Sequence, residues 1–503
     1  MVALDCDDRR SGGVHGKRRM SHDHPVFAVV GHPNKGKSSI VATLAEDESI
    51  AISPDPGTTR AARSFTMRVE SQVLYELIDT PGFQRARATL AWLQDHERGA
   101  NERTDVLREF VRAHESGERF RDECELLRPI LAGAGVLYVV DGAHPFGQEY
   151  EAEMEILRWT GQPRMALINR IGAGDYVEEW RRALNQYFSI VRQFDAQHAD
   201  FAKRLELLRA FRELDERQAA WSASLDRAVR LLEQDRRDRQ RSAAREIADL
   251  LIEALSASES SNAPEGSDEA AIVGRLTEQL KEKLRERERS ARRMVQDLYR
   301  HRALAMQEAP VDVLAGDVFS ERSFAVFGLS ASQLAITGAA TGALAGGAID
   351  LAVGGASLLL GAGIGALVGG ISAVLSSQRL AKVQILGTSL GGHRVIVGPI
   401  SSPNLPWVML VRALLHHRLV FERNHARREA LIVDASSGLH LADAIVPERR
   451  KRIAAWFEKI RKQGGLDADQ RDEFIVTVEE CMGEMPHMYH RDERQSNSAR
   501  REH

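Results

Sequence analysis

Short apolar runs alternate with amphipathic stretches over the first two hundred residues of this 503-residue chain. Several runs are apolar almost throughout, as in strands that are buried on both faces of a sheet. The runs are FAVV (27–30), SFTMRV (64–69), VLYELID (73–79), GVLYVVD (135–141), MALIN (165–169) and FSIVRQF (188–194). Helical patterns separate many of them, which predicts an α/β domain with a doubly wound, mostly parallel sheet.

Helical patterns dominate after residue 198. Residues 198–256 are rich in Glu, Arg, Leu and Ala, and a second helical stretch covers 270–302. The second stretch has charges of alternating sign and leucines at four-residue spacing: Leu276, Leu280 and Leu284. We predict a solvated helical pair or a coiled-coil-like stalk, joined by a polar loop at 256–269, with direct partner recognition as the alternative role. A charged insertion at 84–130 is also predicted to be helical.

The C-terminal part contains further predicted elements. KVQIL (382–386) and HRVIVGPI (393–400) are predicted to form a β-hairpin around Gly391-Gly392, followed by a helix at about 405–422. The remainder is charged and mixed, with one more amphipathic helix near 447–462.

Residues 323–377 form the most unusual segment, because Asp350 is their one charged residue. Glycines recur at four-residue spacing on either side of Gly354-Gly355, at Gly338, Gly342, Gly346, Gly361, Gly365 and Gly369. Such spacing forms a groove that lets two helices approach closely. We predict an antiparallel glycine-zipper hairpin of helices at about 331–353 and 356–377.

The hairpin has two readings. Residues 351–375 are uncharged and would make about 37 Å of helix, which is long enough to span a bilayer. Arg322, Arg379 and Lys382 place positive charge at the base, consistent with cytoplasmic ends. The alternative is a hairpin that is buried against the stalk helices.

Composition adds limited information. The net charge is −4, with 43% apolar and 28% charged residues, as expected of a folded protein without a strong overall field. The three cysteines are far apart, which indicates neither a disulfide framework nor a metal site and favours a reducing compartment. The predicted regions are a disordered arm (1–23), a nucleotide-binding domain (24–197), a stalk (198–322), the hairpin (323–380), a β-hairpin with a helix (381–425) and a charged C-terminal region (426–503).

A phosphate-binding motif follows the first predicted strand. GHPNKGKS (31–38) fits G-x-x-x-x-G-K-[ST] and opens a helix, which is the context that this motif requires. Backbone N–H groups at such a turn hold phosphate oxygens. Lys37 is expected to reach the β- and γ-phosphates, and Ser38 to ligate Mg²⁺. The predicted nucleotide-binding residues here are Gly31, Asn34, Lys35, Gly36, Lys37, Ser38 and Ser39.

Two further motifs follow in order, DPGTTR (55–60) and DTPG (79–82). Asp79 is expected to hold Mg²⁺ through water, and the Gly82 amide to face the γ-phosphate. Phe83 stands where Ras-like enzymes carry the glutamine that positions water, so hydrolysis is expected to be slow.

Together, GxPNxGKS, PGTTR and DTPG resemble the Era/TrmE branch of GTPases over about residues 25–196. The resemblance implies that Thr59 closes on Mg²⁺ and the γ-phosphate, and that Asn34 helps to bind K⁺; the alternative for Asn34 is a loop-stabilising amide. It implies the cofactors Mg²⁺ and GTP or GDP, with K⁺ as a further candidate. The catalytic candidates are Lys37, Thr59 and Gly82, and the metal candidates are Ser38, Thr59 and Asp79 for Mg²⁺ and Asn34 for K⁺.

The base-recognition motif departs from the usual NKxD. In Asn169-Arg170-Ile171-Gly172, Asn169 and Arg170 fit the pattern, but Gly172 replaces the aspartate that binds guanine. Loss of that bidentate contact should weaken binding by about 2–4 kcal/mol. Asp175 is a candidate substitute, and Phe194-Asp195-Ala196 is a candidate fifth motif.

The feature order over most of 25–425 also resembles an uncharacterised bacterial group that joins an Era-like GTPase domain to a stalk and an Ala/Gly-rich hairpin. The leading hypothesis is a slow Mg²⁺-dependent GTPase whose switches act on a hairpin (331–377) at the cytoplasmic face of a membrane, with a homodimer as a candidate form. The alternatives are an Era-like ribosome or RNA factor, although nucleic acid is the less favoured partner, and a non-hydrolysing nucleotide-binding scaffold or ATPase.

Overall fold

The computed structural model describes most of the chain in separate stretches. They are residues 24–47, 61–213, 219–264, 266–301, 317–320, 323, 326–329, 333, 371–374, 384–385, 388–389, 392–400, 402–426 and 441–485. The chain divides into two compact units, Met1–Leu232 with Asn424–Ala426, and Glu233–Arg423 with Arg427–His503. The predicted arm at 1–23 and most of the predicted hairpin fall outside the described stretches.

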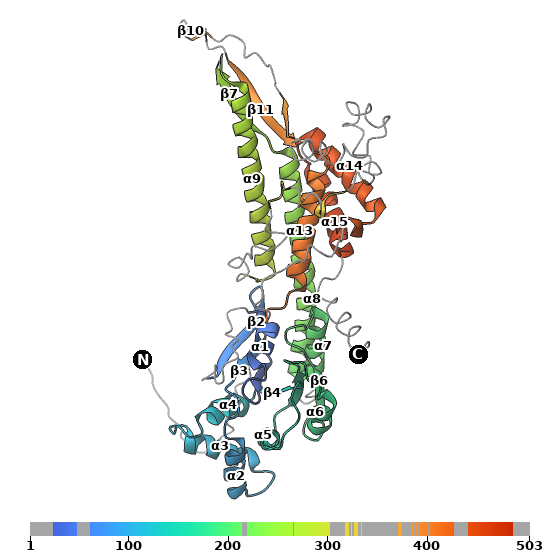
Figure 1. Ribbon diagram of the computed structural model, residues 1–503. Coiled ribbons are helices and arrows are strands. Elements are labelled where there is room, and N and C mark those ends of the chain that lie inside the picture. The colour runs from blue at the N-terminus through green and yellow to red at the C-terminus, as the bar shows by residue number, and fades with distance from the viewer. Residues whose placement is uncertain are drawn as a thin grey trace, which may run out of the picture. The chain divides into compact units, whose positions relative to one another are not determined.

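The first unit is built on a six-stranded sheet with the order β2-β3-β1-β4-β5-β6 (Figure 1). All neighbours are parallel except β2 and β3, which pair antiparallel at one edge. The strands are β1 (Val26–Val30), β2 (Arg63–Val69), β3 (Gln72–Asp79), β4 (Gly135–Asp141), β5 (Arg164–Asn169) and β6 (Ile190–Gln193). The prediction of a mostly parallel sheet is confirmed.

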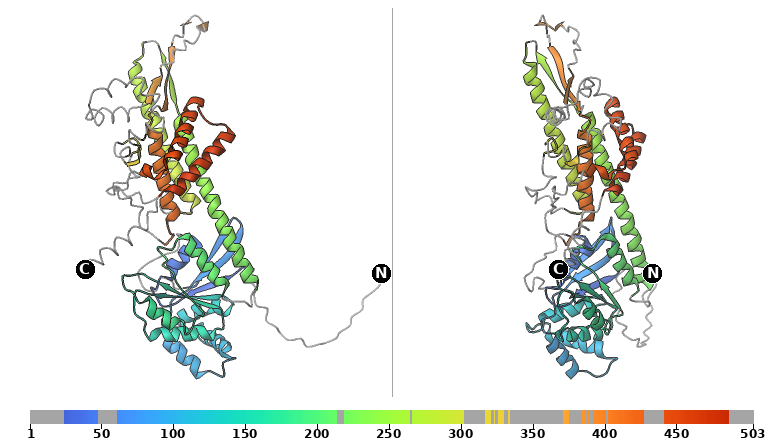
Figure 2. Two further views of the ribbon diagram at one scale, coloured as in Figure 1. Left: turned by 90° about the vertical axis from the view of Figure 1, so that its right-hand side faces the viewer. Right: turned by 45° about the vertical axis from the view of Figure 1, so that its right-hand side comes forward.

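Helices cover both faces of this sheet (Figure 2). The side chains of β1 alternate between two cores, because Ala28 and Val30 face one cluster and Phe27 and Val29 face the other. The helices are α1 (Lys37–Ala45), α2 (Ala86–Asp95), α3 (Arg103–His114), α4 (Arg121–Leu131), α5 (Glu149–Trp159), α6 (Val177–Leu184) and α7 (Phe201–Arg212). The insertion at 84–130 is therefore helical, as predicted.

The first unit extends past the predicted boundary at residue 197. Leu205 and Leu208 of α7 and Leu225 and Leu232 of α8 (Ala219–Ser256) are buried in the core on the α1 side of the sheet. The sequence could not show this boundary, because both helices have the same charged composition as the predicted stalk.

The second unit contains a strand where a loop was predicted. Within 256–269, β7 (Glu259–Pro264) pairs antiparallel with β11 (Gly392–Ile400), and β8 (Ile371–Val374) pairs with the other side of β11. The loop prediction is wrong for Glu259–Pro264, because strand pairing with a distant segment outweighs the polar composition. Ala263 is the buried residue of this strand.

The predicted hairpin of 382–386 with 393–400 is also wrong. Instead, β9 (Gln384–Ile385) pairs with β10 (Thr388–Ser389), and β11 joins the three-stranded sheet. Ile371–Val374 lies inside the predicted second helical arm at 356–377 and forms a strand there. Apart from these residues and residue 333, the predicted glycine-zipper arms lie outside the described stretches.

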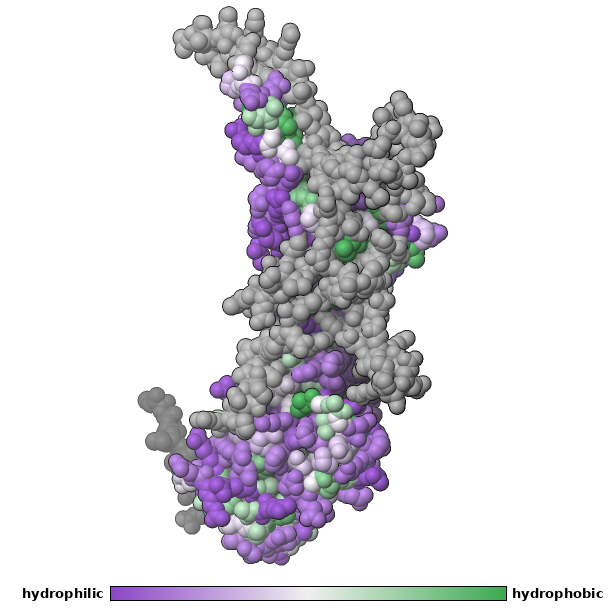
Figure 3. Space-filling model, viewed as in Figure 1, coloured by the Kyte–Doolittle hydropathy of each residue, from purple (hydrophilic) through white to green (hydrophobic). Residues whose placement is uncertain are grey.

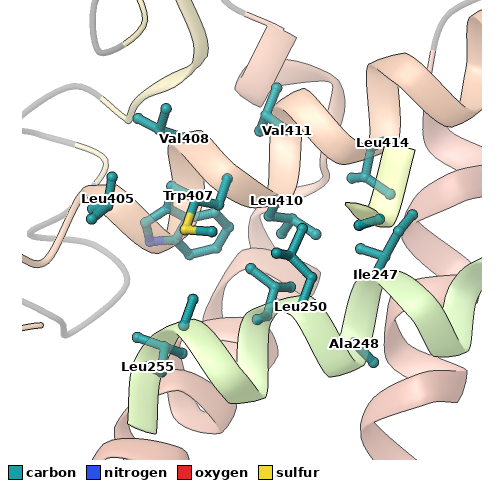
Figure 4. Close-up of a cluster of buried hydrophobic side chains, with 14 of the residues drawn as sticks. Ile247, Ala248, Leu250, Leu255, Leu405, Trp407, Val408, Leu410, Val411 and Leu414 are labelled. Carbon is teal, nitrogen blue, oxygen red and sulfur yellow. The ribbon is translucent and has the colours of Figure 1, made fainter. Parts of the chain in front are cut away.

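Helices form the core of the second unit. Ile247 and Leu250 of α8 pack near Leu410 and Leu414 of α13 (Leu405–Glu422) (Figure 4). The other elements are α9 (Glu269–Leu298), α14 (Pro447–Gln463), α15 (Ala468–Glu484) and the 3-10 helix η3 (Leu441–Ala444). The predicted helices near 405–422 and 447–462 are confirmed, whereas α15 was not predicted.

The leucine stripe of α9 is part of this core. Leu276, Leu280 and Leu284 are buried, so the prediction of a solvated pair is wrong for this face of the helix. The opposite face of α9 carries hydrophilic side chains (Figure 3). Of the helices in the described stretches, none is long and apolar enough to cross a bilayer.

Candidate nucleotide-binding site

The loop between β1 and α1 adopts a conformation that demands glycine at two positions. Gly31 has φ 142° and Gly36 has φ 82°, and Asn34 is also left-handed with φ 59°. A Cβ atom at Gly31 would lie 2.3 Å from the carbonyl oxygen of Val139, and one at Gly36 would lie 2.2 Å from Nδ2 of Asn169. The two glycines therefore let the loop pass close to β4 and β5.

Lys37 lies across this loop from the first turn of α1. Its Nζ atom donates to the carbonyl oxygens of Gly31, at 3.3 Å, and His32, at 3.0 Å. Burial lowers the pKa of Lys37, and the carboxylates of Asp79 and Glu153 oppose that shift. The Lys37 side chain is thus buried and held against the loop by two of its backbone carbonyls.

Ser38 and Asp79 meet beside the loop, one from α1 and one from the end of β3. The Ser38 hydroxyl donates to Asp79 Oδ2 at 2.8 Å. A hydroxyl and a carboxylate are oxygen ligands of the kind that Mg²⁺ prefers, and it typically binds one or two protein groups together with phosphates and water. The two side chains fit the predicted Mg²⁺ site.

The DTPG segment is packed against the cradle. The Thr80 hydroxyl donates to the Val29 carbonyl at 2.8 Å, and the Phe83 amide donates to the Gly31 carbonyl at 3.3 Å. A Cβ atom at Gly82 would lie 2.5 Å from the Pro33 nitrogen. Only glycine therefore fits at residue 82 without moving the cradle.

Some predicted site residues have structural contacts, and one is not described. Lys35 Nζ lies 4.0 Å from Asp141 Oδ2, and Ser39 is buried in α1. Arg170 Nε donates to the Gly174 carbonyl at 3.2 Å, which stabilises the loop after β5. Thr59 falls in the stretch 48–60, which the structure does not describe.

Asn169 joins three parts of the site. Its Nδ2 group donates to the Lys35 carbonyl at 3.3 Å, and its Oδ1 atom accepts from the Ala196 amide at 3.1 Å. The side chain is buried at the end of β5. The structure thus brings the candidate fifth motif, which follows β6, next to the NKxD-like motif and the cradle.

Gly172 and Asp175 occupy an exposed part of the loop after β5. A Cβ atom at Gly172 would meet only Ala143 Cβ, at 3.4 Å, so a side chain would fit there. The missing aspartate is therefore not explained by lack of space at the position itself.

Asp141, at the end of β4, organises the same loop and was missed from the sequence. Its Oδ1 atom accepts from the amides of Ala143, at 2.9 Å, and Ile171, at 3.3 Å, and its Oδ2 atom lies 2.7 Å from His144 Nδ1. An aspartate that ends a fully apolar strand was the one sequence signal for this role.

Asn424 reaches the site from a distant part of the sequence. Its Nδ2 group donates to the Ala199 carbonyl at 2.9 Å, and its Oδ1 atom accepts from the Ala426 amide at 2.9 Å. The buried Thr43 hydroxyl lies 2.8 Å from the Ala196 carbonyl and 2.7 Å from Asn424 Oδ1. A hydroxyl has one proton, so it donates to one of these two acceptors at a time.

A second missed cluster lies under the cradle. Glu153 of α5 is buried, with Oε1 at 2.8 Å from His32 Nδ1 and Oε2 accepting from the Tyr138 hydroxyl at 2.9 Å. Burial raises the pKa of Glu153 and raises that of Tyr138 well above its usual value. This network connects the second residue of the cradle to β4 and α5.

Comparisons with known proteins match two families to the chain, and the second match begins within the first structural unit. Residues 26–170 match the family described as 50S ribosome-binding GTPase, and residues 181–479 match a domain of unknown function, DUF3482. GTPase Der of Moorella thermoacetica is 30% identical over 168 residues, which are 33% of this chain and 31% of that protein. GTPase Era of Halothermothrix orenii is 38% identical over 72 residues, 14% of this chain and 24% of that protein. The chain thus spans a third or less of these two relatives.

Solved structures of Era are also similar to the chain. A complex of Era with MgGDPNP and part of 16S ribosomal RNA has a TM-score of 0.25 and 17% identity, covering 34% of this chain and 51% of that one. Aquifex aeolicus Era bound to GDP and aluminium fluoride has a TM-score of 0.27 and 18% identity, covering 38% and 57%.

Proposed function

The chain belongs to the DUF3482 family and carries an Era-like P-loop GTPase domain, and we propose that it binds GTP with Mg²⁺ and hydrolyses it slowly as a nucleotide switch. The observation that carries the proposal is the cradle itself: Lys37 held over a glycine-shaped loop, with the Ser38 and Asp79 side chains meeting beside it.

Residues of the site have proposed roles in binding phosphate or a metal ion. Backbone N–H groups of the cradle and Lys37 bind the phosphates, and Ser38, Asp79 and Thr59 would hold Mg²⁺, which neutralises charge on the β- and γ-phosphates. The Gly82 amide would contact the γ-phosphate. Asn34, in its left-handed conformation, is the proposed K⁺ ligand.

Slow hydrolysis follows from the residue after DTPG. The Phe83 side chain is buried in the core, so it cannot orient an attacking water. Charge stabilisation must come from another source, such as K⁺ or a second copy of the chain. We expect turnover to rise when K⁺ replaces Na⁺, whereas equal rates in the two salts would argue against the role of Asn34.

Recognition of the base depends on the loop after β5 and is measured separately. Asn169 is in place, but Gly172 supplies no carboxylate for guanine. We propose that GTP is preferred over ATP by a smaller margin than a complete NKxD motif would give. Competition of labelled GTP by unlabelled ATP tests this: equal displacement by the two would instead favour a scaffold or ATPase of relaxed specificity.

Titration of fluorescent GTP with and without Mg²⁺ tests the central proposal. Lys37→Ala removes the phosphate-binding ammonium and should weaken binding at least tenfold. Lys203→Ala is the matched control, because Lys203 is an exposed lysine on α7 of the same unit. Absence of Mg²⁺-dependent binding in the unaltered protein, or equal affinity of the Lys37→Ala variant, would overturn the proposal.

We further propose that the switch acts on a membrane-associated segment within 331–377. The support is sequence chemistry: residues 351–370, which precede β8, are uncharged and correspond to about 30 Å of helix. The competing reading is a segment buried within the protein. Fractionation of cells that express the full chain, or the chain without 331–370, distinguishes the two, because only the first predicts that the deletion moves the protein out of the membrane fraction.

The second candidate is a ribosome or RNA factor. The family description matched by residues 26–170 favours it. Binding of ribosomal RNA that weakens steeply with salt would support this candidate, since phosphate contacts release counterions. Binding that is undetectable at low salt would remove it.

A further inference from the structure

One buried carboxylate holds the backbone that follows DTPG. Glu123 Oε1 accepts from the Gln84 amide at 2.9 Å and from the Arg85 amide at 2.6 Å. Glu123 belongs to α4, is 1% exposed, and lies far along the sequence from the two amides. The contact is therefore a tertiary one that the insertion at 84–130 makes within itself.

The two amides need such an acceptor. They precede α2, where the first N–H groups of a helix have no partner within the helix. Arg85 occupies the N-cap position, and its side chain makes no capping hydrogen bond. A carboxylate at this end accepts charge-assisted hydrogen bonds and also interacts favourably with the helix dipole. Glu123 thus supplies from another helix the cap that α2 lacks locally.

In a GTPase of this kind, the residues that follow DTPG, at about 82–90, would form the nucleotide-responsive segment called switch II, and the held backbone belongs to it. Phe83 is buried and its amide donates to the Gly31 carbonyl of the cradle, while the next two amides donate to Glu123. Consecutive amides from 83 to 85 are therefore fixed between the cradle and α4. Gly82, whose amide would face the γ-phosphate, immediately precedes this fixed stretch.

We propose that Glu123 is a positioning residue that sets the place of switch II for GTP hydrolysis. This inference rests on the proposed GTPase function. The insertion at 84–130 then has a specific role, because α4 delivers the carboxylate that fixes the start of α2. GTP binding through the phosphates does not involve Glu123, so its removal should act on the hydrolytic step and leave GDP affinity unchanged.

Two variants and a control test the proposal in the full chain. Glu123→Ala removes the acceptor, and Glu123→Gln keeps a neutral acceptor of the same shape. The control is Glu125→Ala, which removes a more exposed carboxylate two residues further along α4. Hydrogen exchange of the Gln84 and Arg85 amides should accelerate at least tenfold in the alanine variant, less in the glutamine variant, and not at all in the control.

Single-turnover hydrolysis provides the functional readout. The rate should fall about tenfold in Glu123→Ala and recover partly in Glu123→Gln, with GDP affinity within twofold of the unaltered protein. A normal rate in a folded variant whose two amides exchange rapidly would show that Glu123 is only a helix cap. Unchanged exchange of the Gln84 and Arg85 amides in Glu123→Ala would show that Glu123 does not hold them. Because exchange is measured without nucleotide, this outcome is separate from a failure of the proposed GTPase function.

Discussion

Replacement of Asn169 by alanine should destabilise the first unit even without nucleotide. The change deletes two hydrogen bonds, a partly buried one to the Lys35 carbonyl and a buried one from the Ala196 amide. Loss of the first costs about 1 kcal/mol, and the Ala196 amide, in a residue that is 1% exposed, loses its acceptor at a cost of about 1–3 kcal/mol. The sum of about 2–4 kcal/mol corresponds to a fall of about 4–16 °C in melting temperature for a domain of this size.

Scanning calorimetry of the full chain, followed through the transition of the first unit, measures this effect. Asn185→Ala is the matched control, because the Asn185 side chain is exposed at the end of α6. Asn169→Asp keeps an acceptor for the Ala196 amide but loses the donor to the Lys35 carbonyl, so its melting temperature should lie between those of Asn169→Ala and Asn185→Ala. A melting temperature for Asn169→Ala within 1 °C of the unaltered protein would refute the reasoning, as would unchanged hydrogen exchange at the Ala196 amide.

Three further predictions concern other parts of the molecule. Burial lowers the pKa of His417 to about 3 and that of His416 well below the usual 6.5, so their contribution to stability is complete above pH 6.5. Below pH 6.5 the unfolded chain takes up protons that the folded chain does not, so His417 alone should lower the free energy of unfolding by about 1.4 kcal/mol per pH unit. Thermal unfolding between pH 6.5 and 4.5 should therefore show a weaker dependence of stability on pH for His417→Gln than for the unaltered protein. Glu288 Oε1 lies 2.7 Å from both the buried Arg412 Nε and Arg292 Nη2, so Glu288→Ala deprives both arginines of this partner and should cost about 3–5 kcal/mol in denaturant unfolding. Replacing the whole network, Glu288→Met with Arg412→Leu and Arg292→Leu, should restore most of that loss. Asn424→Ala should destabilise the first unit by about 1–3 kcal/mol in calorimetry, and an unchanged first transition would show that its hydrogen bonds contribute little.

The first unit could be predicted closely because its signals are local. The runs at 27–30 and 135–141 are apolar almost throughout, and their short length favours strands buried on both faces over helices. The cradle is likewise specified by adjacent residues, since Gly31 and Gly36 each occupy a left-handed position that other residues avoid.

The rest depends on partners that lie far away in the sequence. β7 is rich in serine and becomes a strand because β11 pairs with it. The leucines of α9 are equally compatible with a coiled coil or a domain core, and only the position of α13 decides between them. Glu123 and Asn424 are single polar residues whose roles come from tertiary contacts, so no local pattern distinguishes them from exposed ones.

The segment Asn424–Ala426 makes the first unit discontinuous in sequence, and this has a consequence for its synthesis. The ribosome completes Leu232 about 190 residues before it adds Asn424. At about 5–20 residues per second, the nascent nucleotide-binding domain would wait roughly 10–40 s for its last buried residues. During that interval the Ala199 carbonyl lacks the Asn424 donor, and Thr43 has only the Ala196 carbonyl as its acceptor. Completion of the first unit thus waits for translation of Glu233–Arg423, although the second unit still lacks Arg427–His503 at that moment.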